Sequence, residues 1–196
     1  ECLVIADETA RADFIAADLL AQCEHDPNAR GALVTTSESL AQRTLAEIER
    51  QLKERKTEDV ARESWEKKGV VVVVDSLDEA AEYANAYAPE HLEVHAAEPR
   101  SLIPLLTNYG SLFLGENTAE VYADKIAGPN HILPTGRTAR YTGGLWVGMF
   151  MKVVTHMETD LKASLKLAEY AETQAEFERM DAHRFAATIR LKTLKE

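Results

Sequence analysis

The 196-residue chain contains little cysteine and has no excess of positive charge. Its two cysteines, Cys2 and Cys23, are too few for a disulfide framework and form no CxxC pair, which predicts a reducing, cytoplasmic setting. The formal net charge of -11 argues against a basic face for phosphate contacts. We therefore expect no nucleic-acid partner.

Long apolar runs and leader segments are also missing. No stretch approaches the roughly 20 apolar residues that a membrane-spanning helix requires, and no signal peptide opens the chain, so we expect no membrane partner. The chain also lacks an initial methionine and enters a buried-strand pattern directly at Cys2. We expect that it starts in mid-domain and that an N-terminal part of the protein precedes it.

Neither common nucleotide-binding fingerprint occurs in these residues. No GxGxxG motif follows a predicted strand, and no GxxxxGK[ST] motif is found anywhere. If the protein uses a dinucleotide, the residues that hold it lie elsewhere. The cofactor-binding residues are therefore unknown at this stage.

What is present is the composition of a soluble globular domain, with 45% hydrophobic and 28% charged residues. Five apolar segments have the length and composition of strands. They cover residues 2–6, 31–35, 70–74, 92–95 and 111–114. The run of valines at 70–74 is typical of a sheet covered on both faces. Helical segments separate these strands, two of them capped by Ser37 and Ser76.

This alternation predicts a Rossmann-like α/β fold, with a parallel sheet flanked by helices. In such sheets, ligands gather outside the carboxyl ends of the strands, and we expect the site there. The charged segment 53–68 is expected to continue the helix that Ser37 caps, with Trp65 turned inward. A further helix is expected at about 100–106.

The pattern changes in the last third of the chain. A Gly/Pro loop at 128–136 is followed by an apolar amphipathic segment at 145–153 and by a purely helical pattern from residue 158, with a bend near 178–181. We place a boundary near Tyr141, which separates an α/β domain (1–141) from a small helical tail domain (142–196). Such a tail buries little surface alone, so it is expected to pack on its own domain or on a neighbouring subunit.

Gln22 and His25 stand at the predicted end of the first helix, just before Pro27. Residues three apart share a helix face, so both side chains can point at one object. A carboxamide oxygen and an imidazole can coordinate a metal, but they supply only half of a zinc site. The alternative is that two polar residues decorate a frayed helix end.

Glu90 and His91 follow the proline that stops the third predicted helix, and they precede a predicted strand. A carboxylate beside an imidazole is an acid/base couple, because histidine can take and return a proton near neutral pH. The alternative is a solvated loop pair. His131 lies at the centre of the Gly/Pro loop, whose ordering is costly, and this favours a binding role.

Asp124 precedes this loop, and His183 lies beside Asp181 on the predicted tail helix. With Gln22 and His25 they would offer two nitrogen and two oxygen atoms, a possible zinc site. Spacing across so much of the chain does not establish that assembly. An exposed helical histidine is the alternative interpretation of His183.

Several motifs, taken in order, resemble those of the histidinol dehydrogenase family. They are DLLAQCEHDP (18–27), APEHLE (88–93), SLFLG (111–115), GPNHILPT (128–135) and DAH (181–183). The resemblance covers almost the whole chain but only the C-terminal half or so of the family's polypeptide.

The resemblance implies roles for individual residues. Gln22, His25 and Asp124 are similar to three zinc ligands, and His183 to the fourth, which in that family comes from the tail of the partner subunit in a homodimer. Asp124 also takes part in substrate binding. His91 resembles the general base for the alcohol proton, and Glu90 the residue that activates water for the second oxidation. Two further positions resemble substrate contacts, namely His131 and Glu178.

The family oxidises L-histidinol to L-histidine through the aldehyde with two NAD, as the last step of histidine biosynthesis, and this reaction is the first expectation. The family's other Rossmann-like domain is absent, so we expect the chain alone to be inactive. The segment Gly136–Gly148 differs from biosynthetic enzymes and is similar to relatives that oxidise other small polar alcohols, such as sulfopropanediol. A non-catalytic fragment that binds metal and dimerises is the third possibility.

Overall fold

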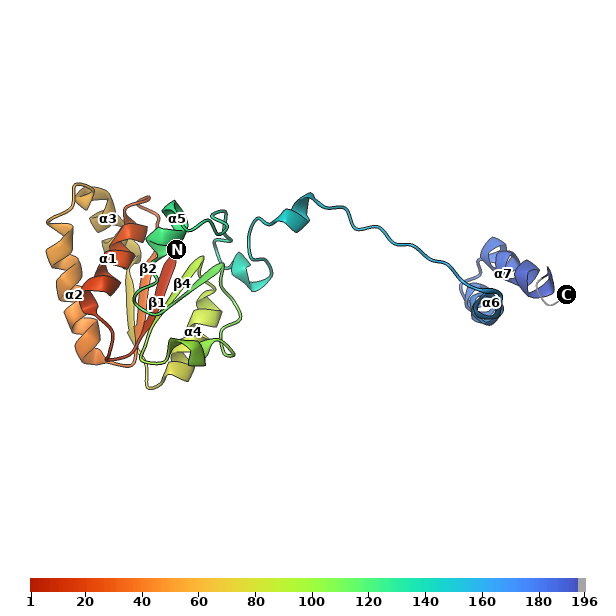
Figure 1. The fold of residues 1–196 in the computed structure, drawn as a ribbon, viewed down its shortest axis with the longest axis horizontal. Coiled ribbons are helices and arrows are strands. Elements are labelled where there is room, and N and C mark those ends of the chain that lie inside the picture. The colour runs from red at the N-terminus through yellow and green to blue at the C-terminus, as the bar shows by residue number, and fades with distance from the viewer. Residues whose placement is uncertain (194–196) are drawn as a thin grey trace. The chain divides into compact units, whose positions relative to one another are not determined.

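The computed structural model describes residues 1–193 and divides the chain into two compact units. The first unit is Glu1–Phe150 and the second is Met151–Glu196 (Figure 1). The boundary expected near Tyr141 thus falls inside the first unit. None of the described helices is long and apolar enough to cross a membrane.

The first unit is built on a five-stranded sheet with the order β3-β2-β1-β4-β5, in which all strands run parallel. The strands are β1 (Cys2–Ala6), β2 (Gly31–Thr35), β3 (Val70–Val73), β4 (His91–His95) and β5 (Ser111–Leu114). Since the chain moves outward from β1 in one direction to β3 and in the other to β5, the order reverses between β1 and β4. The predicted Rossmann-like α/β class is confirmed.

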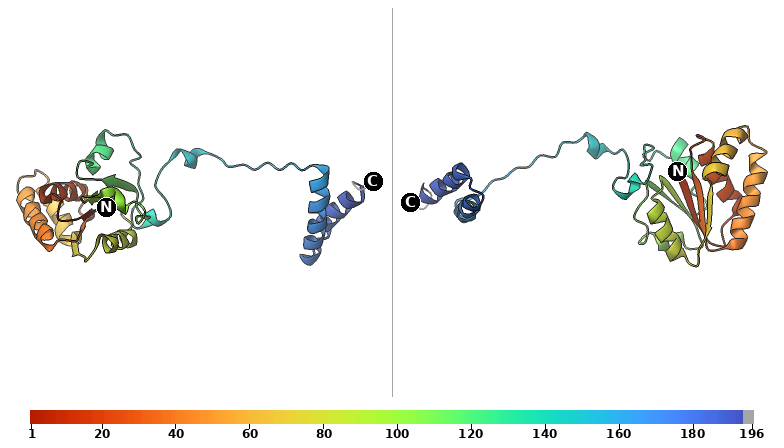
Figure 2. Two further views of the ribbon diagram at one scale, coloured as in Figure 1. Left: turned by 60° about the horizontal axis from the view of Figure 1, so that its bottom comes forward. Right: turned by 180° about the vertical axis from the view of Figure 1, so that it is seen from behind.

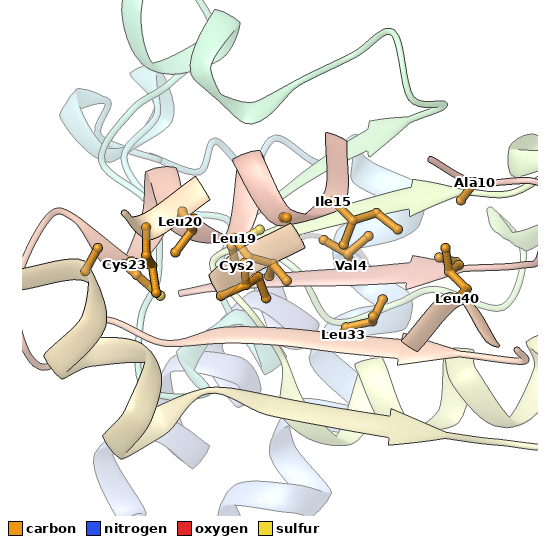
Figure 3. Close-up of a cluster of buried hydrophobic side chains, with 14 residues drawn as sticks. Cys2, Val4, Ala10, Ile15, Leu19, Leu20, Cys23, Leu33 and Leu40 are labelled. Carbon is orange, nitrogen blue, oxygen red and sulfur yellow. The ribbon is translucent and has the colours of Figure 1, made fainter. Parts of the chain in front are cut away.

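Helices cover both faces of this sheet (Figures 1 and 2). On one face lie α1 (Ala12–Cys23), α2 (Glu38–Leu52) and α3 (Glu58–Lys68); on the other lies α4 (Leu77–Tyr87), followed after β4 by the short 3-10 helix η1 (Pro99–Leu102). Successive side chains of a strand point to opposite faces, so alternate residues of β1 enter two separate apolar clusters. The cluster beneath α1 and α2 is drawn in Figure 3, where Cys2 and Val4 meet Ile15, Leu19 and Leu40.

Local sequence signals set the ends of these helices. The Ser37 hydroxyl accepts a hydrogen bond from the Leu40 amide (3.1 Å), and the Ser76 hydroxyl accepts one from the Glu79 amide (3.1 Å). Both predicted caps are confirmed. At the other end of α4, Ala88 adopts a left-handed conformation (φ 54°), and Pro89 follows it. A proline cannot continue a helix, so the chain is directed into β4.

Two expectations about secondary structure were wrong. The segment 53–68 does not continue α2: the chain breaks after Leu52, and the separate helix α3 packs Ala61 and Trp65 against the α1 cluster. A straight continuation could not make that contact. Strand β3 lies at the edge of the sheet and its side chains are partly exposed, but Val71 packs against the α1 cluster and Val70 and Val72 pack against the α4 cluster, as expected for a sheet covered on both faces. Only η1 forms at 99–102, since Pro104 prevents a longer helix.

The rest of the first unit consists of the short helix α5 (Glu120–Lys125), the Gly/Pro loop, and two 3-10 turns, η2 (Thr138–Arg140) and η3 (Val147–Phe150). The second unit contains α6 (Leu161–Phe177) and α7 (Asp181–Thr193), which pack against each other (Figure 2). The predicted bend between them is present, with Arg179 in a left-handed conformation (φ 58°). Few side chains of this helix pair are buried, whereas Tyr170, Phe177 and Phe185 are exposed.

Candidate metal and acid/base site

The sequence-predicted residues of the first unit gather at the edge where the parallel strands begin, which we call the amino edge. Helix α1 returns antiparallel to β1, so Gln22 and His25 at its end lie at this edge. Glu90 and His91 are there because they immediately precede or begin β4. The expectation of a site at the carboxyl ends of the strands was therefore wrong, since Gln22 and His25 lie at the end of α1 and Glu90 and His91 lie at the start of β4.

Asp124 of α5 lies at the centre of three imidazole side chains. Its Oδ1 is 3.0 Å from His131 Nδ1 and 3.8 Å from His91 Nε2, and its Oδ2 is 3.8 Å from His25 Nε2. The Asp124 side chain is only 5% exposed, and its Oδ1 has no partner with hydrogen-bond geometry among the described residues. The structure thus brings together residues that are far apart in the chain, such as His25 and His131, which are 106 positions apart.

Glu120 is a member of this cluster that the sequence analysis missed. Its Oε1 lies 3.5 Å from His91 Nδ1, and the residue is 3% exposed. Burial, and then the neighbouring Glu93 and Asp124 carboxylates, raise the pKa of Glu120 to about 8, so it is mostly protonated at neutral pH. The sequence could have indicated Glu120, because it lies four residues before Asp124 and so shares one face of α5 with it.

His91 is held in a dry environment at the first position of β4. Its side chain is 6% exposed, and its ring lies beside Phe113 with the centroids 6.0 Å apart. Burial lowers the pKa of His91, because the charged imidazolium loses hydration, and this outweighs the opposing effect of the nearby Glu90 carboxylate. The imidazole is consequently neutral at pH 7, the form in which it can accept a proton.

Glu90 lies at the mouth of this cluster and is 18% exposed. Its Oε2 is 4.0 Å from His91 Nδ1. The two residues predicted to act as an acid/base pair are therefore neighbours in space as well as in sequence. A carboxylate at this distance can also reach a water molecule that approaches the imidazole.

The donor atoms at the amino edge fit a zinc ion. His25, Glu120 and Asp124 each place one nitrogen or oxygen within 4.8 Å of the others. Gln22 is 6% exposed, and its buried Oε1 has no hydrogen-bond partner among residues 1–193. An unpaired buried carbonyl oxygen is costly, and a metal ion is one partner that would satisfy it.

The two remaining predicted residues belong to the second unit. His183 is exposed in the first turn of α7 and lines a groove between α6 and α7, whereas Glu178 follows α6 and accepts a hydrogen bond from Gln174 Nε2 (2.7 Å). Their predicted roles as zinc ligand and substrate contact stay predictions.

A second buried polar cluster extends along the same face of β4. His91, Glu93 and His95 pair with Cys2, Val4 and Ala6 of β1 and so point toward α1. Glu93 is completely buried, and its Oε2 lies 3.2 Å from His95 Nε2, a partner that the sequence analysis did not assign. Burial, and then the Glu93 carboxylate, raise the pKa of Asp18 to about 7. The alternation of polar and apolar residues along β4, His-Leu-Glu-Val-His, could have indicated this cluster from the sequence.

Fold and site together define a Rossmann-like α/β domain that carries a nitrogen- and oxygen-rich candidate metal site beside a neutral, buried histidine. The family model of histidinol dehydrogenase matches residues 1–191. The chain belongs to the histidinol dehydrogenase family, as the resemblance of its motifs predicted.

Individual relatives agree with this assignment. The chain is 46% identical over 192 residues to a histidinol dehydrogenase homolog of Shouchella clausii, covering 98% of this chain and 45% of the relative. It is 42% identical over 191 residues to the histidinol dehydrogenase of Zymomonas mobilis, covering 97% and 44%. The crystal structure of histidinol dehydrogenase from Elizabethkingia anophelis superposes with a TM-score of 0.95 at 35% identity, covering 100% of this chain and 45% of that one. The chain thus spans a little under half the length of these relatives.

Proposed function

We propose that the chain is part of a zinc-dependent, NAD-linked dehydrogenase that oxidises L-histidinol to L-histidine through the aldehyde. The observation that carries the proposal is the position of Asp124, which lies within 3.0–3.8 Å of three imidazoles, and the buried Gln22 carboxamide oxygen at the same edge of the sheet has no hydrogen-bond partner among the described residues. Family membership adds the reaction class. Since the chain spans under half of its relatives, activity, substrate and partners are proposals for the whole protein.

Gln22, His25 and Asp124 would hold the zinc ion, with His183 of a partner subunit as the fourth ligand in a homodimer that exchanges its tails. Bound zinc supplies an anchor and a Lewis acid for an alcohol or amine of the substrate. His131, which is exposed and 3.0 Å from Asp124, would contact the substrate, as would Asp124 itself and Glu178.

His91 is proposed to remove the proton of the alcohol. Its Nδ1 lies 3.3 Å from the backbone carbonyl of Glu1 and 3.5 Å from Glu120, so the ring proton is held on Nδ1. The lone pair of Nε2 then faces Asp124 and the proposed substrate. In each oxidation a hydride leaves the substrate carbon for the nicotinamide, and in the first the alcohol proton passes to His91 Nε2.

Glu90 is proposed to take a proton from the water that adds to the aldehyde before the second oxidation. It is the most exposed carboxylate beside His91, which suits a group that exchanges protons with water. The nicotinamide cofactor itself needs residues that we do not assign, because no glycine-rich phosphate loop occurs in this chain. The isolated chain is therefore proposed to be inactive.

The deciding experiment compares substrates in the full-length protein. Zinc content and NAD reduction are measured with L-histidinol and with sulfopropanediol, and turnover of histidinol with one bound zinc per subunit is the expected result. Turnover of neither alcohol by the zinc-loaded protein would contradict the proposed oxidation. Metal binding without turnover would instead support the non-catalytic alternative.

A second candidate keeps the chemistry and changes the alcohol. One observation favours it: a relative of high identity carries the description of a homolog rather than of the enzyme itself. The expectation drawn from the sequence of segment 136–148 points the same way. Faster turnover of sulfopropanediol than of histidinol would select this candidate. We further propose a cytoplasmic location, in keeping with two buried, free cysteines.

A further inference from the structure

The short helix α5, which carries Glu120 and Asp124, is secured by a side chain from the sheet. Helix α5 has only six residues, and its N-cap residue, Ala119, provides no side-chain hydrogen bond. The first amide of the helix, that of Glu120, instead donates to Oε1 of Glu93 on β4, at 3.0 Å and away from solvent. Glu93 thus replaces the missing cap from a distant part of the sequence.

Glu93 is well suited to fix the helix. It lies on a central strand of the sheet and is 0% exposed, so its side chain has little freedom. Its other oxygen, Oε2, lies 3.2 Å from Nε2 of His95, which is also buried. A negative charge at a helix N-terminus is favourable, because the free amide groups there carry partial positive charge. No lysine or arginine forms an ion pair with Glu93 within the described part of the chain.

We infer that Glu93 is a positioning residue for the metal and acid/base site, although it touches neither the proposed metal nor the substrate. Its carboxylate holds the start of α5, and α5 in turn places Asp124 beside His25, and Glu120 beside His91. His91, the proposed base, and Glu93, which fixes the start of α5, therefore occupy alternate positions on one face of β4. This inference rests on the proposed function and deepens it.

The test separates the hydrogen bond from the charge. Glu93→Gln keeps an oxygen that can accept from the Glu120 amide, whereas Glu93→Met fills a similar volume without an acceptor. Hydrogen exchange of the Glu120 amide and zinc affinity are measured for the full chain and both variants. We expect protection of this amide in the wild type and Glu93→Gln, its loss in Glu93→Met, and roughly 10- to 100-fold weaker zinc binding in Glu93→Met only.

Equal loss of zinc affinity in both variants would overturn the inference, since the acceptor would then not matter. Rapid exchange of the Glu120 amide in the wild-type chain would overturn it without any variant, which keeps the test valid even if Glu93→Met does not fold. Failure of the proposed function gives a different result: Asp124→Asn would leave zinc binding unchanged while the Glu120 amide stays protected.

Discussion

At the scale of single residues, the site depends on burial that keeps an imidazole neutral. His91 is nearly inaccessible, and the loss of hydration lowers its pKa. The same burial keeps Glu120 mostly protonated, with its pKa raised to about 8. A neutral base beside a neutral acid avoids an excess of negative charge near Asp124.

Replacing His91 tests its role directly. In the full-length protein, His91→Asn removes the proton acceptor but retains a polar side chain of similar reach. We expect kcat to fall by about 10²- to 10⁴-fold, the usual contribution of general base catalysis, with zinc content unchanged. Metal analysis and steady-state kinetics check this. A variant with near-normal kcat would show that another group takes the proton.

Asp18 predicts how stability depends on pH. Its pKa is about 7 in the folded protein and close to 3.8 in the unfolded chain, so the folded state retains a proton that the unfolded state releases. Stability from this group is present at low pH and is lost as pH rises from about 4 through 7. We expect Asp18→Asn to be more stable than the wild type at pH 8 by on the order of 1–3 kcal/mol, with the difference absent near pH 4.

Denaturant unfolding at the two pH values provides the measurement. Asp13→Asn is the matched control on the same helix, because Asp13 is exposed and its hydrogen bond with Arg11 lowers its pKa. The control should not gain stability at pH 8. An equal response of both variants would indicate a general effect of net charge.

At the scale of elements, α4 depends on its cap. The Ser76 hydroxyl accepts from the Glu79 amide, and α4 covers the apolar cluster on its face of the sheet. We expect Ser76→Ala to lower the free energy of unfolding by about 1 kcal/mol, and Ser76→Asp, which keeps an acceptor, to lower it much less. Chemical denaturation measures both, and equal losses would mean that the cap is not responsible.

The elements also show what the sequence could predict. Strands appeared as apolar runs, so all five were predicted at nearly their observed bounds. Helices appeared as capped periodic segments, but the residues of α3 were wrongly expected to continue α2. Strand order is not encoded in any local apolar run, so the position of β3 at the edge of the sheet could not be predicted. Motif resemblance supplied the residues around Asp124, but Glu120 and Glu93 escaped notice because their importance depends on a packing contact between β4 and α5.

At the scale of the whole molecule, the second unit buries few side chains and is not expected to be stable on its own. Its helices leave Tyr170, Phe177 and Phe185 exposed, and the adjoining segment leaves Trp146 and Phe150 exposed. Exposed apolar side chains in such numbers favour association. This agrees with the proposed exchange of tails between two subunits.

The exchange can be tested by complementation. Variants His25→Ala and His183→Ala of the full-length protein should each lose zinc and activity as homodimers. If His183 acts on the partner subunit, every mixed dimer regains one complete site, so random mixing should restore about one quarter of wild-type zinc binding and activity. No recovery after subunit exchange, with mixed dimers shown by mass spectrometry, would contradict ligand donation between subunits.

The alternation along β4 links chemistry to the fidelity of folding. A slip of one residue in the pairing of β4 with β1 would turn His91, Glu93 and His95 into the apolar cluster under α4, and would turn Leu92 and Val94 toward Asp18. The shifted register is therefore strongly disfavoured, because it would bury polar side chains without partners. The same three polar residues thus serve the site and fix the register in which β4 pairs with β1, so that a shifted, inactive pairing does not compete with the native one.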